Sequence, residues 1–166
     1  MTLIADATPL IFLAKVNQLR LITEVFEAQI LIPSVVEKEI LCPDIPPDEE
    51  RLLRAFLPTC KVVDVRNPHV YAGGLSFADN CVLTLAVQEH ASMILSDDRL
   101  VRRVAVIEGF RAVGTLGILI RAKRRSLLSA EKAMGIFDRF VKEHTFRINT
   151  HVYDAVRKEI LNNRTK

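Results

Sequence analysis

The stretch Ile94-Leu95-Ser96-Asp97-Asp98-Arg99 decides the fold. A short apolar run over residues 93–95 ends in two adjacent aspartates, and the apolar residues of 100–105 then follow with helical spacing. This pattern predicts a buried strand that delivers carboxylates at its carboxyl end and is followed by a helix. Ligands of open α/β sheets bind outside the carboxyl ends of the strands, so the doublet is a candidate site. One of the two aspartates is expected to cap the helix, because Asp is a favoured N-cap residue.

The beginning of the chain has the same arrangement. Residues 3–5 are apolar, Asp6 follows them, and Thr8-Pro9 predicts a helix start with Thr8 as the cap. Two predicted strands that each end in Asp indicate one acidic site assembled from distant segments.

A third carboxylate comes from the helix predicted after Ser34. At about 100° per residue, Glu39 falls on the apolar face between Val35 and Val36, whereas Glu37 points to solvent. Glu37 also occupies the capping-box position relative to Ser34. An inward carboxylate is unfavourable unless it is paired or binds a metal, so Glu39 is a candidate functional residue. The alternative is that Glu39 is paired with an Arg.

A fourth carboxylate, Asp79, starts a helix that runs to about His90 and is apolar on most sides, which is typical of a buried helix. Ser76 and Asp79 have the spacing of a capping box. Capping and metal binding are compatible at Asp79, because a carboxylate has two oxygens.

The whole chain alternates strands with helices and ends in three helices. This order predicts a three-layer α/β/α fold with a central, mainly parallel sheet of four to five strands. A single domain over 1–166 is expected, with a core at about 1–113 and a C-terminal helical extension at about 114–166. The expected strands are 3–5, 29–32, 61–65 at an edge, 93–95 and 111–113, and the expected helices are 10–16, 19–26, 35–41, 48–57, 80–90, 100–108, 116–122, 130–142 and 150–161.

Composition narrows the class of protein. The chain has 166 residues, no apolar stretch long enough to span a bilayer, and no basic leader with a cleavage site, so a cytoplasmic protein without a membrane partner is expected. Its three cysteines lack zinc or disulfide spacing and are expected to be free thiols.

Charge is divided unevenly along the chain. Residues 1–95 carry a net charge of −5 and residues 96–166 a net charge of +8, which together give +3. This division is consistent with metal-binding carboxylates beside a phosphate-binding surface. The alternative is that the helix surfaces of the second half are simply rich in Lys and Arg.

Several chemistries lack their motifs. The sequence has no glycine-rich phosphate loop, no nucleophile elbow and no His pair at zinc-ligand spacing. An oxygen-only ligand set remains, which suits Mg²⁺ or Mn²⁺ and is found where phosphate esters are processed. Its members are Asp6, Glu39, Asp79, Asp97 and Asp98.

Four segments, in order, resemble the PIN-domain ribonucleases, which include toxins of prokaryotic toxin–antitoxin pairs. The resemblance spans about residues 3–113 and favours Asp98 over Asp97 as the member of the metal site. The tail from Gly114 onward resembles a subgroup with extra C-terminal helices. The segments are Ile4-Ala5-Asp6-Ala7-Thr8-Pro9-Leu10, Ile32-Pro33-Ser34-Val35-Val36-Glu37-Lys38-Glu39, Leu75-Ser76-Phe77-Ala78-Asp79 and Leu95-Ser96-Asp97-Asp98-Arg99.

The resemblance implies Mg²⁺- or Mn²⁺-dependent endonucleolytic cleavage of RNA that leaves a 5′-phosphate and a 3′-hydroxyl. Asp6, Asp79 and Asp98 would be metal ligands, Asp97 could share the metal, and Glu39 would position metal-bound water. Thr8 would hydrogen-bond the water shell of the metal, unless it caps its helix. RNA would contact Arg99, Arg102 and Arg103, with Lys123, Arg124 and Arg125 as more distant candidates.

The expected partners are RNA, a cognate antitoxin protein and a second copy of the chain. The apolar residues Ile11, Phe12, Leu21 and Phe26 would form a homodimer face or belong to the core. The alternative to an enzyme is a catalytically silent PIN-fold protein-interaction module. A metal-dependent phosphatase is disfavoured, because its Asp-x-Asp signature is absent at residues 6–8.

Overall fold

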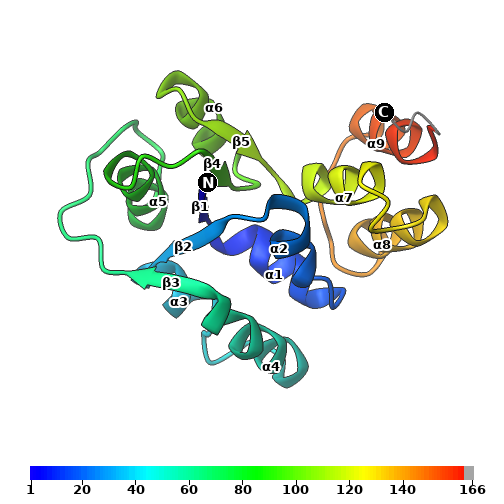
Figure 1. Ribbon diagram of the computed structural model, residues 1–166, viewed down its shortest axis with the longest axis horizontal. Helices are drawn as coiled ribbons and strands as arrows, with labels where there is room; N and C mark the ends of the chain where they lie inside the picture. The colour runs from blue at the N-terminus through cyan, green and yellow to red at the C-terminus, as the bar shows by residue number, and fades with distance from the viewer. Residues whose placement is uncertain (163–166) are drawn as a thin grey trace.

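A computed structural model of the chain, in which residues 1–162 are described, contains a five-stranded parallel sheet with the order β3-β2-β1-β4-β5 (Figure 1). Parallel pairing throughout requires a crossover between successive strands, and the helices supply it. The predicted three-layer α/β/α architecture is confirmed, and so is the edge position of the third strand. The strands are β1 (Thr2–Ala5), β2 (Gln29–Pro33), β3 (Cys60–Val63), β4 (Met93–Leu95) and β5 (Arg111–Val113).

Helices cover both faces of the sheet. Helices α5 and α6 lie on one side, α1 and α2 lie on the other, and α7 packs on α1 and α2 (Figure 1). The helices are α1 (Ala7–Lys15), α2 (Arg20–Phe26), α3 (Ser34–Ile40), α4 (Pro47–Phe56), α5 (Phe77–Gln88), α6 (Arg99–Ile107), α7 (Thr115–Arg124), α8 (Ala130–Lys142) and α9 (Thr150–Leu161), with a 3₁₀ turn at Leu57–Thr59. None of the helices within residues 1–162 is long and apolar enough to cross a membrane.

Strand register aligns the ends of the central strands. Ala5 of β1 pairs with Leu95 of β4, and Leu95 pairs with Val113 of β5. The apolar residues of β1 and β4 are buried, as expected for strands covered on both faces. The residues that follow, Asp6 and Ser96, therefore leave the sheet side by side at its carboxyl edge.

Two predicted helix caps are wrong. Asp6, rather than Thr8, is the N-cap of α1, so Thr8 lies within the first turn. Ser34 makes no cap hydrogen bond and instead donates its hydroxyl to Asp64 at 3.2 Å. The physical reasons differ: α1 begins directly after Asp6, whose carboxylate takes the Ala7 amide, whereas the Ser34 hydroxyl is engaged by Asp64, thirty positions away.

The C-terminal helices share the hydrophobic core of the sheet layer. Phe140 of α8 is fully buried, and the ring of Phe12 in α1 packs edge-on against Phe140 and against Phe146. Leu21 and Phe26 are buried as well, while Ile11 and Phe12 are partly buried against the core. The apolar residues that were candidates for a homodimer face thus lie in or against the core of this chain, with α7 packed over α1 and α2.

We expect Phe140→Ala to lower the free energy of unfolding by about 3–5 kcal/mol, because it removes a fully buried aromatic ring. Val106→Ala on exposed α6 is the control and should change it by less than about 0.5 kcal/mol. Urea denaturation followed by far-UV circular dichroism measures both. A single transition is expected, and two separate transitions would show that α7–α9 fold as an independent unit.

Candidate active site

Asp6 is the buried centre of the acidic site. Its amide donates to the Leu95 carbonyl at 2.9 Å, which places the side chain at the junction of β1 and β4. One carboxylate oxygen accepts from the Ala7 amide at 2.7 Å and the other accepts from the Ser96 hydroxyl at 2.8 Å. Burial, together with the negative charges of Asp79 and Glu39, raises the pKa of Asp6 to about 6, although the hydrogen bonds from Ser96 and Ala7 oppose the increase.

Ser96 is a site residue that sequence reasoning did not assign. It is fully buried, donates to Asp6 and accepts from the Asp98 amide at 3.1 Å, so it links the ends of two strands. The sequence signal for Ser96 is a small hydroxyl residue directly after a buried strand. Its partner Asp6 becomes evident only from the register between β1 and β4.

Asp79 reaches the site from the first turn of α5. The predicted capping box is confirmed: the Asp79 carboxylate accepts from the Ser76 amide at 2.7 Å, and the Ser76 hydroxyl accepts from the Asp79 amide at 3.0 Å. The box uses Oδ2 of Asp79 and leaves Oδ1 outside these bonds. Asp79 is half-buried, and its charge acts on both Asp6 and Glu39.

Glu39 differs from its predicted environment. It is exposed, whereas its neighbours Val36 and Ile40 are completely buried, so the prediction that it points into the core is wrong. The helical wheel placed Glu39 on the buried face and Glu37 toward solvent, whereas Glu39 is the more exposed of the two. Partial removal from water, and then the charge of Asp79, raise the pKa of Glu39.

The Asp97-Asp98 doublet is engaged in structural bonds. Asp98 is exposed and caps α6, where its Oδ1 accepts from the amides of Leu100 at 2.7 Å and Val101 at 2.8 Å. This confirms that one member of the doublet caps the helix. Neither Asp97 nor Asp98 is among the charges within residues 1–162 that raise the pKa of Asp6.

Asp97 ties β4 to the start of α7. Its carboxylate accepts from the amide of Thr115 at 2.8 Å and from the Thr115 hydroxyl at 2.5 Å. Gly114 permits this approach, because a Cβ there would lie 2.5 Å from Oδ1 of Asp97. Burial raises the pKa of Asp97, while the Thr115 hydrogen bonds and the charge of Arg102 oppose the increase.

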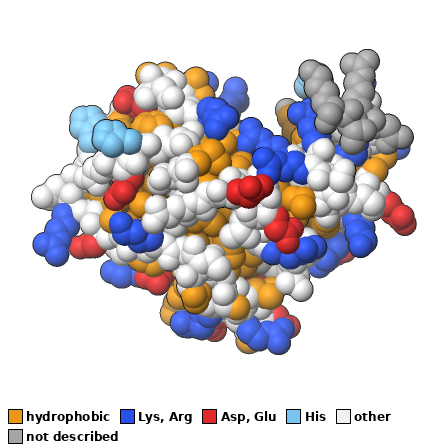
Figure 2. Space-filling model, in the orientation of Figure 1, with side chains coloured by type: hydrophobic (Ala, Val, Ile, Leu, Met, Phe, Trp, Pro, Cys, Tyr) orange, Lys and Arg blue, Asp and Glu red, His pale blue; other side chains and the backbone are white. Residues whose placement is uncertain are grey.

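The basic candidates fall into two groups. Arg99, Arg102 and Arg103 lie on α6, directly after the acidic doublet at the carboxyl edge of the sheet. Arg124 and Arg125 instead line a cavity with Met1 and Met93, at the amino ends of β1 and β4, and pair with Glu159 and Glu27. Lys123 bonds the Asn162 carbonyl. Figure 2 shows Lys and Arg side chains gathered where the α7–α9 region adjoins the body of the molecule.

The acidic residues fit a hydrated divalent cation. No three His, Cys, Asp or Glu side chains within residues 1–162 converge closely enough to hold a metal ion by themselves. Mg²⁺, however, keeps several waters and is usually bound through one or two carboxylates. Asp6 and Asp79 could provide these carboxylates, and Glu39 could hydrogen-bond the waters, because the three charges already act on one another.

Comparison with known proteins identifies the fold family. The family model DUF3368, a PIN domain, matches residues 2–162, which include α7–α9. The chain belongs to the PIN-domain family. PIN domains are commonly nucleases, and in this chain the charges of Glu39 and Asp79 act on Asp6 at the end of β1.

Among solved structures, the PIN fold of this chain is similar to a PilT N-terminus domain protein from the hyperthermophilic archaeon Sulfolobus solfataricus P2. The two are 14% identical, the match covers 71% of this chain and 90% of that chain, and the TM-score is 0.52. This likeness shows the fold alone. A search of curated proteins gave no match.

Asp6 is expected to make stability depend on pH. Because its pKa is higher in the folded chain than in the unfolded chain, the folded state holds the proton more tightly. The free energy of unfolding should therefore fall by about 2 kcal/mol as the pH rises from about 4 to about 7 without metal. Urea titrations in EDTA measure this change, which Asp6→Asn should abolish. Asp44→Asn, at an exposed loop position, is the control and should keep it.

Asp97→Ala is expected to act on stability rather than on metal binding. It removes two hydrogen bonds between β4 and α7 and should cost about 1–3 kcal/mol of unfolding free energy. Mn²⁺ affinity, measured by calorimetry on the folded variant, should stay at the wild-type value. A marked loss of Mn²⁺ affinity would instead place Asp97 among the metal ligands.

Proposed function

We propose that this PIN-domain protein is an Mg²⁺- or Mn²⁺-dependent endoribonuclease and the toxin of a toxin–antitoxin pair. The observation that carries the proposal is the placement of three carboxylates in a PIN fold: Asp6 directly after β1, Glu39 on α3 and Asp79 in the first turn of α5, close enough for the charge of Asp79 to raise the pKa of both Asp6 and Glu39. Two of these carboxylates cap helices, but capping does not require them to lie near one another, and each raises the free energy of its ionised neighbours. A bound cation would reverse that penalty.

Each acidic residue has a separate role in the proposed reaction. Asp6, held by Ala7 and Ser96, would anchor the cation at a defined point. Asp79 and Asp98 would each present the carboxylate oxygen that their cap hydrogen bonds do not use. Glu39, with solvent access, would orient or deprotonate the attacking water. The bound divalent ion would polarise the scissile phosphate and lower the pKa of that water. Thr8 is not used as a cap and could bond the water shell.

An RNA substrate is supported by charge. The arginines of α6 follow the acidic edge directly, and residues 96–166 carry a net charge of +8. Guanidinium groups bind phosphate backbones, and such binding weakens steeply with salt. With no Trp and few aromatic residues, backbone contacts would supply most of the affinity.

Protein partners are part of the same proposal. A cognate antitoxin would silence the acidic site, and a second copy would pair through a surface other than the α1–α2 face. Phe77, Val106 and Ile107 are large apolar side chains exposed on α5 and α6. The competing candidate is a silent interaction module, for which these exposed side chains would be the whole functional surface.

Cleavage of a pooled set of structured RNAs tests the proposal. Purified protein should cut RNA with Mg²⁺ or Mn²⁺ and not with EDTA, leaving 5′-phosphate ends. Asp6→Asn and Glu39→Gln should each lower the rate at least about a hundredfold, in the range of lost charge stabilisation at a reacting centre. Glu89→Gln, at the half-buried C-cap position of α5 and at the opposite end of that helix from Asp79, is the matched control and should cut normally.

The outcomes separate the candidates. Metal-dependent cuts that survive in both variants would remove the acidic site from the mechanism. Folded protein that binds Mn²⁺ but cuts no RNA would favour the silent module. A rate that stays equal in EDTA would contradict the metal-dependent chemistry altogether.

A further inference from the structure

A cavity of about 680 Å³ opens where the C-terminal helices meet the carboxyl edge of the sheet. Asp97 and Gly114, which follow β4 and β5, form part of its wall. Asp97 comes directly after Ser96, the residue that holds the Asp6 carboxylate at 2.8 Å. The cavity therefore adjoins the acidic site at the ends of neighbouring strands.

The wall on the sheet side is held in place by hydrogen bonds. Arg102 donates from Nη1 to the carbonyls of Asp97 at 2.7 Å and Ser96 at 3.3 Å. Asp97 in turn is fixed by the amide and hydroxyl of Thr115. Because backbone carbonyls hold the Arg102 guanidinium in place, this side of the cavity is preorganised.

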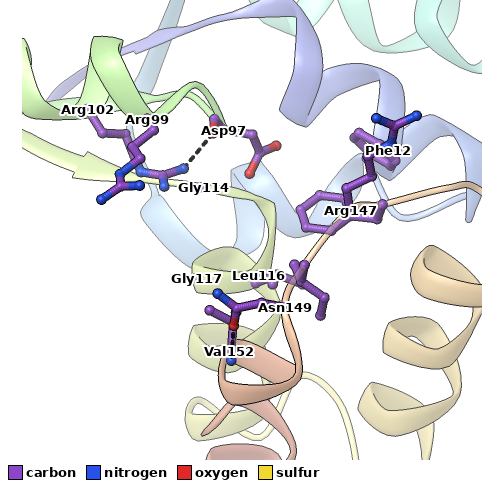
Figure 3. A pocket seen from close by; sticks show the side chains of 12 residues that line it. Phe12, Asp97, Arg99, Arg102, Gly114, Leu116, Gly117, Arg147, Asn149 and Val152 are labelled. Carbon is purple, nitrogen blue, oxygen red and sulfur yellow. Dashed lines mark hydrogen bonds between the residues drawn. The ribbon is translucent and has the colours of Figure 1, made fainter. Parts of the chain in front are cut away.

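The opposite wall comes from the segment between α8 and α9. The amide of Phe146 donates to the Phe140 carbonyl at 3.0 Å, and the ring of Phe146 lies 4.6 Å from that of Phe12. Phe146 and Ile148 are half-buried while Arg147 between them is exposed. Figure 3 shows Phe12 and Arg147 facing Arg99 and Arg102 across the cavity, with Leu116 between them.

The cavity carries excess positive charge. Arg99, Arg102 and Arg147 line it together with a single carboxylate, Asp97, which is bonded to Thr115. Among residues 1–162, no carboxylate forms a salt bridge with any of the three arginines. Arg99 and Arg147, which make no salt bridge within residues 1–162, lie beside apolar rings and fit a ligand that has both an anionic group and a flat apolar body.

We propose that this cavity binds one nucleotide of a single-stranded RNA, so that the C-terminal segment completes the substrate-binding surface. The inference rests on the proposed ribonuclease function. Arg99 and Arg147 bind the phosphate, and the base lies against the apolar wall of Phe12, Phe146 and Leu116. A volume of about 680 Å³ is within the usual range for a small-molecule site, and aromatic contacts with bases tolerate any sequence.

Binding without catalysis tests the cavity directly. Fluorescence anisotropy of a labelled single-stranded oligouridylate is measured in EDTA, over a series of salt concentrations, for the full chain. Arg147→Gln should weaken binding about tenfold and reduce the salt dependence by about one phosphate contact. Arg147→Lys should recover part of the affinity, because it keeps the charge but loses the planar guanidinium. Arg99→Gln should weaken binding similarly.

Arg157→Gln is the matched control, since Arg157 is exposed on α9 and does not line the cavity. It should bind RNA as the wild type does. Wild-type affinity in Arg147→Gln would overturn the proposal. An equal loss of affinity in Arg147→Gln and Arg157→Gln would also overturn it, because that result would indicate only an effect of general charge.

Competition identifies the ligand chemistry. Uridine 5′-monophosphate should displace the oligonucleotide more effectively than either uridine or inorganic phosphate. Phosphate that competes as well as the nucleotide would overturn the role of the apolar wall. RNA binding that depends on Arg147 without any metal-dependent cleavage would reject the ribonuclease and keep the cavity. Metal-dependent cleavage together with RNA binding that does not depend on Arg147 would reject the cavity and keep the ribonuclease.

Discussion

The parallel pairing of β1 with β4 is the constraint on which the site depends. The hydrogen bond from the Asp6 amide to the Leu95 carbonyl, at 2.9 Å, continues the ladder one residue beyond the strands. It places a carboxylate in a buried position beside the Ser96 hydroxyl. Burial makes the ionised Asp6 unfavourable in the free protein, as its raised pKa shows, and this is the condition under which a cation gains most from binding.

The strand ends serve two chemistries at one edge of the sheet. Asp6 faces Asp79 and Glu39 and forms the acidic part, while Asp97, one residue after Ser96, turns to Thr115 and forms the wall of the arginine-lined cavity. The Ser96 side chain bonds Asp6 and the adjacent Asp97 side chain bonds Thr115, so the acidic residues and the basic cavity lie on either side of this short segment after β4.

The C-terminal helices are part of the core rather than an appendage. Phe137 and Phe140 of α8 are fully buried, and Phe137 stacks on Tyr153 of α9 at 5.0 Å between ring centroids. Helix α7 packs against α1 and α2, and Phe140 of α8 packs against Phe12 of α1, so these helices cover apolar residues that otherwise would lie exposed. It also carries Arg147 to the side of the cavity opposite α6.

The sequence by itself determined the order of strands and helices, the parallel sheet, the Ser76–Asp79 capping box and the presence of carboxylates at strand ends, because these follow from periodicity and short-range polar contacts. Tertiary structure alone decided which carboxylates meet. Glu39 is solvent-exposed beside Asp79, and Asp97 is bonded to Thr115, eighteen positions away. Such partners depend on strand register and on packing between distant segments. A local sequence pattern does not specify how far apart two distant segments lie in space.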